Sequence, residues 1–141
     1  MPKILVAPYK YVQEANTLKN MGSYLSLLGD NACILIDEVV FPSLRGAVEK
    51  SLNEKGITFF FEKFTDECTN SKIKKVTEIV KKKKANIVVG IGGGKTTDTA
   101  KAVAYYSNTA TVIVPTIAAT DSATSSLSVI YSEEHILEEV L

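Results

Sequence analysis

The stretch NIVVGIGGGKTTDTAKA, from Asn86 to Ala102, begins with an apolar run, continues with four glycines in five positions and ends in a helical pattern. This order predicts a β-strand, a tight turn and the start of an α-helix. Such an arrangement presents backbone N–H groups and the positive end of a helix to a phosphate. Gly92, Gly93 and Gly94 have no Cβ, so the backbone there can approach a pyrophosphate closely. Three glycines in a row cost conformational entropy without adding packing, which favours a ligand over a bare turn.

The spacing of these glycines matches neither common nucleotide-binding motif. A P-loop that includes Gly94 and Lys95 would need its first glycine at position 89, where the chain has valine. The dinucleotide fingerprint G-x-G-x-x-G would need its third glycine at position 95, which is the lysine. Three readings stay open: a phosphate site with its own spacing, to which Lys95 adds charge; an ATP- or phosphate-binding loop; and a turn without a ligand. Thr96, Thr97 or Asp98 could cap the helix.

Strand-like and helix-like segments alternate on both sides of this stretch. Short apolar runs predict strands over residues 3–7, 32–36, 57–64, 86–92 and 111–115. Apolar residues at three- and four-residue steps predict helices over 13–28, 44–52, 73–80 and 97–106. This alternation predicts a three-layer α/β, Rossmann-like domain, in which helices cover both faces of a mostly parallel sheet.

The carboxyl-terminal residues are expected to form a strand, a turn and a second strand, although residues 136–141 could equally form a helical turn. The chain ends on the apolar Leu141, without a polar tail. We therefore expect one domain, residues 1–141, that is truncated within a hairpin at about 124–141.

Composition and charge exclude several classes of partner. Sixteen basic and sixteen acidic residues cancel, so no overall field favours nucleic acid or an anionic membrane. The amino-terminal apolar run is too short for a signal peptide, and no segment resembles a membrane span. Cys33 and Cys68 are not spaced like a metal or redox motif, and they are expected to be reduced thiols of a cytoplasmic protein.

Asp37 directly follows an apolar run, at the carboxyl end of a predicted strand, where open α/β sheets bind ligands. A carboxylate there can accept both hydroxyls of an adenosine ribose and would repel a 2′-phosphate, which favours NAD over NADP. Asp37 precedes the glycine turn, whereas the acidic residue usually follows it. A solvated strand end or a helix cap is therefore the alternative.

The segment PTIAATDSATSSLSVIY, residues 115–131, is dense in hydroxyl and small side chains. It could hydrogen-bond ribose, amide or polyol groups, or it could be a Ser/Thr-rich turn in which Asp121 caps a helix. His135 is the single histidine, and it is expected to be an exposed turn residue. Because a catalytic zinc takes three protein ligands, no metal site is predicted in this chain.

Four stretches together carry a family resemblance: KYVQ (10–13), IDE (36–38), GIGGGKTTDTAKAVA (90–104) and VIVPTIAATDSATSSLSVIYS (112–132). They resemble the amino-terminal half of glycerol dehydrogenases, within the metal-dependent, so-called iron-containing alcohol dehydrogenase family. In that family a G-x-G-G-G-K-T turn clamps the pyrophosphate of NAD, which explains the unusual spacing.

The resemblance implies a role for each matching position. Asp37 takes the adenosine ribose, and Asp121 contacts the polyol. The pyrophosphate is surrounded by Gly92, Gly93, Gly94 and Lys95. The cofactor is also lined by Thr116, Ala119, Ser125, Leu127 and Tyr131, the last three toward its nicotinamide half. Relatives often have serine where this chain has Ala119 and proline where it has Ala123.

The family oxidises glycerol to dihydroxyacetone and passes the hydride to NAD. Zinc, or another divalent metal, is held there by an aspartate and two histidines of a helical second domain, which these 141 residues do not contain. The resemblance therefore implies that the chain is inactive unless a separate helical half completes it. A free-standing NAD-binding module or an inactive remnant is the alternative. The unsupported carboxyl-terminal hairpin is expected to promote self-association.

Overall fold

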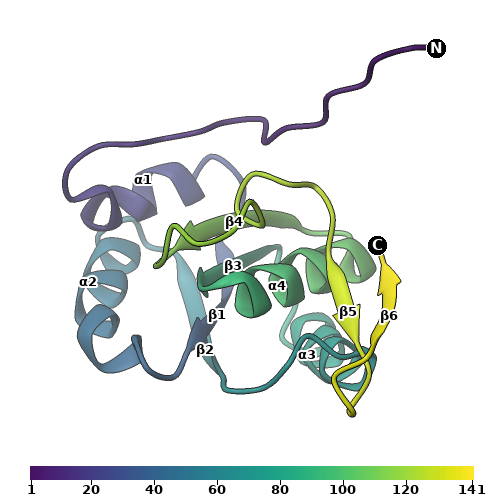
Figure 1. Cartoon of the computed structure of the whole chain (residues 1–141). Helices are drawn as coiled ribbons and strands as arrows, with labels where there is room; N and C mark the ends of the chain where they lie inside the picture. The colour runs from purple at the N-terminus through teal and green to yellow at the C-terminus, as the bar shows by residue number, and fades with distance from the viewer.

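The computed structural model describes residues 1–141 and contains a four-stranded parallel sheet between two layers of helices (Figure 1). The strands are β1 (Asn31–Asp37), β2 (Thr58–Phe64), β3 (Ile87–Gly92) and β4 (Ala110–Pro115), in the order β2-β1-β3-β4. All three pairings are parallel. The predicted three-layer fold is therefore confirmed, and the carboxyl ends of all four strands lie at one edge of the sheet.

Alternating side chains of β1 build two separate cores. Ala32, Ile34 and Ile36 pack with the helices η1 (Thr17–Asn20), α1 (Met21–Leu25) and α2 (Phe41–Glu54) on one face. Cys33 and Leu35 pack with α3 (Asn70–Lys82) and α4 (Gly94–Ser107) on the other face. Such a strand reads as a continuous apolar run because successive side chains point to opposite, equally buried faces.

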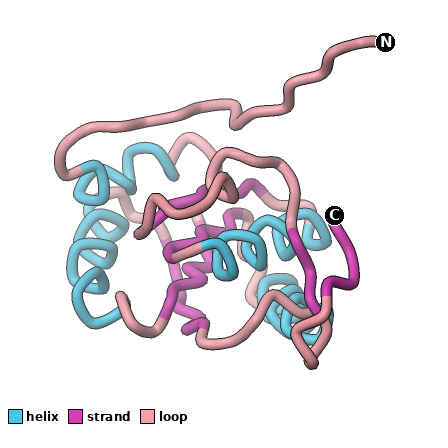
Figure 2. The backbone as a smooth tube through the Cα atoms, in the orientation of Figure 1, coloured by secondary structure: helices cyan, strands magenta, loops and turns pink.

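Two amino-terminal predictions are wrong. Residues 3–7 form no strand: the first ten residues are exposed and extend away from the domain (Figure 2). An apolar run forms a strand only where a neighbouring strand pairs with it, and none does here. The helix expected over 13–28 is reduced to η1 and α1, because Asn16 has a left-handed φ of 63° that blocks a helix before Thr17.

The carboxyl-terminal residues form the hairpin that the sequence predicts. β5 (Val129–Tyr131) and β6 (Leu137–Val140) pair antiparallel as a separate sheet, so the helical alternative for 136–141 is wrong. Ile130 is fully buried in the core beneath α3 and α4, which attaches the hairpin to that face of the domain. His135 lies in the turn with a positive φ of 62° and is exposed, as predicted.

Both cysteines are free and buried. None of the helices has the length and apolarity that crossing a lipid bilayer requires.

Candidate functional site

A cavity of about 380 Å³ opens at the carboxyl edge of the sheet. Because β1 and β3 are neighbours in parallel register, Asp37 at the end of β1 lies beside Gly92 at the end of β3. A Cβ added at Gly92 would lie 3.0 Å from the Cβ of Asp37. The cavity is lined by Asp37, Phe64, Thr65, Asp66, Gly93, Gly94, Lys95 and Thr96. The fold therefore brings the predicted strand-end carboxylate and the predicted glycine turn to one site.

Asp37 is half-buried, and it does not cap a helix, because α2 begins only at Phe41. Its Oδ1 accepts a hydrogen bond of 2.8 Å from the backbone N–H of Val39. No group of the chain donates to the other carboxylate oxygen. Asp37 is thus fixed by one oxygen and keeps the second for a hydroxyl donor.

The glycines of this stretch differ in whether the packing of the fold requires a residue without a Cβ. A Cβ at Gly90 would lie 2.6 Å from the Cβ of Ala100, so glycine there permits the close packing of α4 on β3. A Cβ at Gly92 would lie 2.7 Å from the Oγ1 of Thr96. Gly93 and Gly94 are different: the nearest atoms to an added Cβ lie at 3.5 Å, an ordinary contact. Neither of these two has a positive φ. The fold itself therefore does not need glycine at 93 and 94, and the bare backbone there borders the open cavity.

The amino terminus of α4 points its N–H groups to this cavity without a side-chain cap. Gly93 is the N-cap residue, and no side chain hydrogen-bonds at that position. Thr96, Thr97 and Asp98, which the sequence offered as possible caps, do not cap the helix, because all three lie inside it and are buried. The first N–H groups of a helix have no acceptor within the helix, and they favour an anion.

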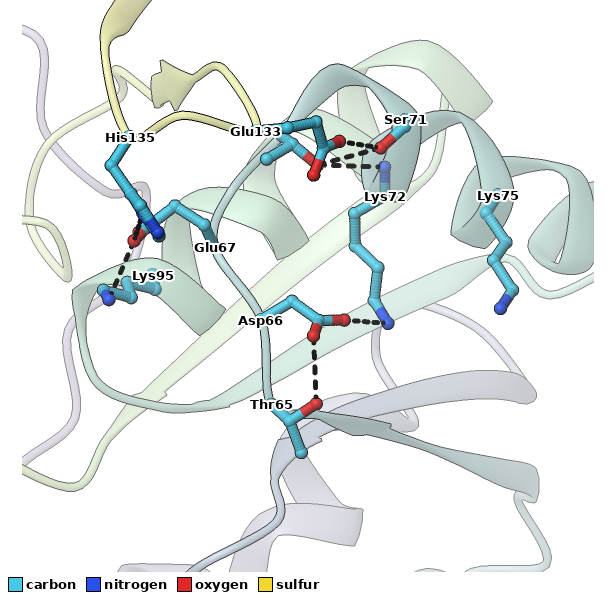
Figure 3. A pocket seen from close by; sticks show the side chains of 10 residues that line it. Thr65, Asp66, Glu67, Ser71, Lys72, Lys75, Lys95, Glu133 and His135 are labelled. Atoms are coloured by element: carbon cyan, nitrogen blue, oxygen red, sulfur yellow. Dashed lines mark hydrogen bonds and ion pairs between the residues drawn. The ribbon is translucent and has the colours of Figure 1, made fainter.

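Lys95 lies between this cavity and a second one of about 560 Å³ (Figure 3). Its Nζ lies 2.8 Å from the Oε2 of Glu67, and the Nδ1 of His135 lies 3.1 Å from the same oxygen. Burial by itself raises the pKa of Glu67, but the hydrogen bonds and charges of Lys95 and His135 outweigh it and lower that pKa overall. The lysine is therefore paired with a carboxylate, which the sequence did not indicate.

The other predicted residues lie on the segment that follows β4. The N–H of Thr116 donates to the carbonyl of Gly92 over 3.1 Å, which anchors this segment to the glycine turn. Tyr131 is half-buried in β5, and its N–H donates to the carbonyl of Cys68. Thr116, Ala119, Asp121 and Leu127 are exposed, and Ser125 is half-buried. None of these residues lines the cavity of the glycine turn. The reading of Asp121 as a helix cap is wrong, because no helix follows it.

Sequence reasoning missed a buried polar network on α4. Asp98 and Lys101 are each only 9% exposed, and their Oδ1 and Nζ atoms are 2.9 Å apart. The hydroxyl of Ser122 donates to Asp98 over 2.6 Å. One signal was available: an acid and a base three positions apart, in the part of the helix where the residues between and just after them are small or apolar. It indicates a pair that is buried together.

The residues of this chain do not fit a divalent metal site. No group of three or more His, Cys, Asp and Glu side chains is placed to hold a metal ion. His135, whose Nδ1 contacts Glu67, has no further ligand beside it.

Comparisons with known proteins place these features in context. The family model described as "Iron-containing alcohol dehydrogenase" matches residues 8–140. The glycerol dehydrogenase of Citrobacter freundii is 40% identical over 141 residues, which cover 100% of this chain and 39% of that protein. The glycolaldehyde reductase of Halobacterium salinarum is 39% identical over 139 residues, 99% of this chain and 38% of that protein.

A solved structure agrees with these sequence matches. The probable glycerol dehydrogenase from Sinorhizobium meliloti 1021 superposes with a TM-score of 0.89 at 38% identity, over 99% of this chain and 38% of that one. The chain thus spans less than two-fifths of the length of these relatives.

Proposed function

Because the chain belongs to the iron-containing alcohol dehydrogenase family, we propose that it is the NAD-binding domain of a dehydrogenase that oxidises a small polyol, with glycerol as the substrate. The bound nicotinamide ring supplies the hydride acceptor, and the residues of this chain bind and orient it.

One observation carries this proposal: glycine occupies positions 93 and 94 although neither packing nor φ requires it there. These two glycines lie beside an uncapped helix amino terminus and a half-buried aspartate. A glycine costs backbone entropy relative to alanine. Where neither packing nor φ requires it, the remaining use is the close approach of another molecule. The uncapped N–H groups favour an anion, and the free oxygen of Asp37 favours a hydroxyl. A pyrophosphate joined to a ribose satisfies both at once.

The proposed contacts extend along the cofactor from this point. Asp37 accepts hydrogen bonds from the adenosine ribose, and Gly92 to Lys95 surround the pyrophosphate. Lys95 has to exchange Glu67 for the phosphate or share its charge between them. The remaining cofactor contacts are assigned to Thr116, Ala119, Ser125, Leu127 and Tyr131. Asp121 is assigned to the polyol.

The substrate class rests on the relatives. Two of them are named for glycerol and glycolaldehyde, both small hydroxylated molecules. Since the chain has no metal site of its own, we propose that a metal-bearing helical domain, in the same or another chain, completes the active site. The exposed apolar residues of the hairpin, Ile136, Leu137 and Val140, support contact with such a domain or self-association. We place the protein in the cytoplasm, where NAD is available.

Calorimetric titration of the 141-residue protein with NAD, ADP-ribose and ATP with Mg²⁺ tests this function. NAD and ADP-ribose share the two riboses and the pyrophosphate, so both should bind at one site per chain. ATP should bind at least about tenfold more weakly than NAD, because it lacks the second ribose, a difference of about 1.4 kcal/mol. Tighter binding of ATP, or no binding of NAD at millimolar concentration, would contradict the proposal.

A further inference from the structure

The buried pair of Asp98 and Lys101 holds the loop of residues 122–128 in place. The Nζ of Lys101 lies 2.8 Å from the carbonyl oxygen of Ser122 and 3.2 Å from that of Ser125, and it also donates to the carbonyl of Leu127. An ammonium group has three protons to donate. One lysine therefore hydrogen-bonds to three backbone carbonyls of a segment that has no helix or strand.

Asp98 fixes both ends of the same loop. Its Oδ1 accepts from the hydroxyl of Ser122 over 2.6 Å, and its Oδ2 accepts from the N–H of Val129 over 3.3 Å. Its backbone carbonyl accepts from the hydroxyl of Ser128 over 2.9 Å. The side chain thus spans the loop from its first residue to the start of β5.

The other hydrogen bonds of the loop are mostly local. The N–H groups of Thr124 and Ser125 donate to the carbonyl of Asp121, and the N–H of Leu127 donates to the hydroxyl of Ser125. These bonds lie within the loop or join it to Asp121. Two contacts besides those of the buried pair attach it to the domain: the hydroxyls of Thr97 and Ser122 are 2.6 Å apart, and Ser128 and Leu141 exchange backbone hydrogen bonds. Burying an ion pair is an expensive way to gain stability, since well-packed apolar residues often serve as well or better. A role in positioning explains better why charges are buried here.

We propose that Asp98 and Lys101 are positioning residues, which set the loop of residues 122–128 against α4 so that Ser125 and Leu127 meet the nicotinamide half of the cofactor. The inference rests on the proposed NAD-binding function. Helix α4 then sets two parts of the dinucleotide site: its amino terminus lies at the pyrophosphate, and its buried pair positions the loop at the nicotinamide half.

The double variant Asp98→Asn/Lys101→Met tests this inference, because it removes both charges together and leaves neither one buried alone. Calorimetry compares its affinities for NAD and for ADP-ribose, which lacks the nicotinamide. Wild type should bind NAD about tenfold more tightly than ADP-ribose. The variant should bind the two ligands within about twofold of each other, with its affinity for ADP-ribose unchanged. Hydrogen exchange of residues 122–128 should become at least tenfold faster, while β1 and β3 keep their protection.

Two further variants separate positioning from a general loss of structure. Ser122→Ala removes one hydroxyl beside Asp98 and should reduce the preference for NAD over ADP-ribose to a value between those of wild type and the double variant. It replaces the double variant in the test if that variant does not fold. Arg45→Met/Glu49→Gln removes an ion pair of α2, 2.6 Å apart, and should change neither ratio.

Each failure has its own meaning. Wild type that binds neither ligand contradicts the proposed function. Wild type that binds both ligands equally, or variants that keep the full preference for NAD, overturn the positioning role alone.

Discussion

Gly94→Ala is expected to leave the protein folded and to weaken its affinity for NAD about 100-fold or more, which corresponds to about 2.7 kcal/mol. The nearest atom to the new Cβ is the Oγ1 of Thr120 at 3.5 Å, so the free protein accommodates it. Alanine also favours the helix that begins at this residue. The methyl group would, however, add bulk to the glycine turn that borders the cavity, on the side of Thr120 and Ser122, and we expect it to hold a pyrophosphate away from the helix amino terminus. Calorimetry measures the affinity, and thermal unfolding measures the stability.

Two other glycines provide the controls for this result. Gly46→Ala lies in α2, where nothing lies within 4 Å of the new Cβ, and it should change neither binding nor folding. Gly90→Ala should lower the unfolding free energy by about 1–3 kcal/mol, because its Cβ would lie 2.6 Å from that of Ala100. If Gly94→Ala lowers stability as Gly90→Ala does, Gly94 serves the fold. If Gly94→Ala binds NAD like wild type, Gly94 has no role at the pyrophosphate.

The second large effect is expected at Asp37. Wild type should prefer NAD over NADP about 100-fold, because the carboxylate would lie close to the 2′-phosphate, and close like charges in a partly buried site repel by several kcal/mol. Asp37→Asn removes the charge and keeps an oxygen that can accept from the N–H of Val39. It should lower the affinity for NAD about tenfold and raise that for NADP, so that the preference falls below about fivefold, with most of the repulsion gone.

The neighbouring carboxylate is the matched control for this substitution. Glu38 is exposed and does not line the cavity. Glu38→Gln removes the same charge from an adjacent position and should leave the preference for NAD unchanged. If both variants shift the preference equally, the discrimination comes from the general field of the protein, and Asp37 loses its role at the ribose.

The sequence predicted those parts of the site that depend on local pattern and on sheet direction. An apolar run before the glycines and a helical pattern after them were sufficient to locate β3 and α4. The proximity of Asp37 to the turn followed because each lies at the carboxyl end of a strand in one parallel sheet. The carboxyl ends of such strands share an edge of the sheet.

The parts that were missed depend on contacts between distant segments. Residues 3–7 are apolar enough for a strand, but nothing in the run says whether another strand lies beside it. The pairing of Lys95 with Glu67 joins the glycine turn to the loop between β2 and α3, and no spacing rule relates them. The bonds from Lys101 to the loop after β4 cross more than twenty positions of sequence. Periodicity identifies elements and their buried faces, but it does not identify such partners.

Mapping of amide chemical shifts while ¹⁵N-labelled protein is titrated with NAD tests most directly whether the glycine turn holds the pyrophosphate. The largest changes should fall on the N–H signals of Gly93, Gly94 and Lys95, with smaller changes near Asp37. ADP-ribose should reproduce these changes, since it carries the same pyrophosphate. Changes confined to the second cavity, which Ser71, Lys72 and Lys75 help to line, would contradict the account, and so would a turn that stays unperturbed when NAD is saturating.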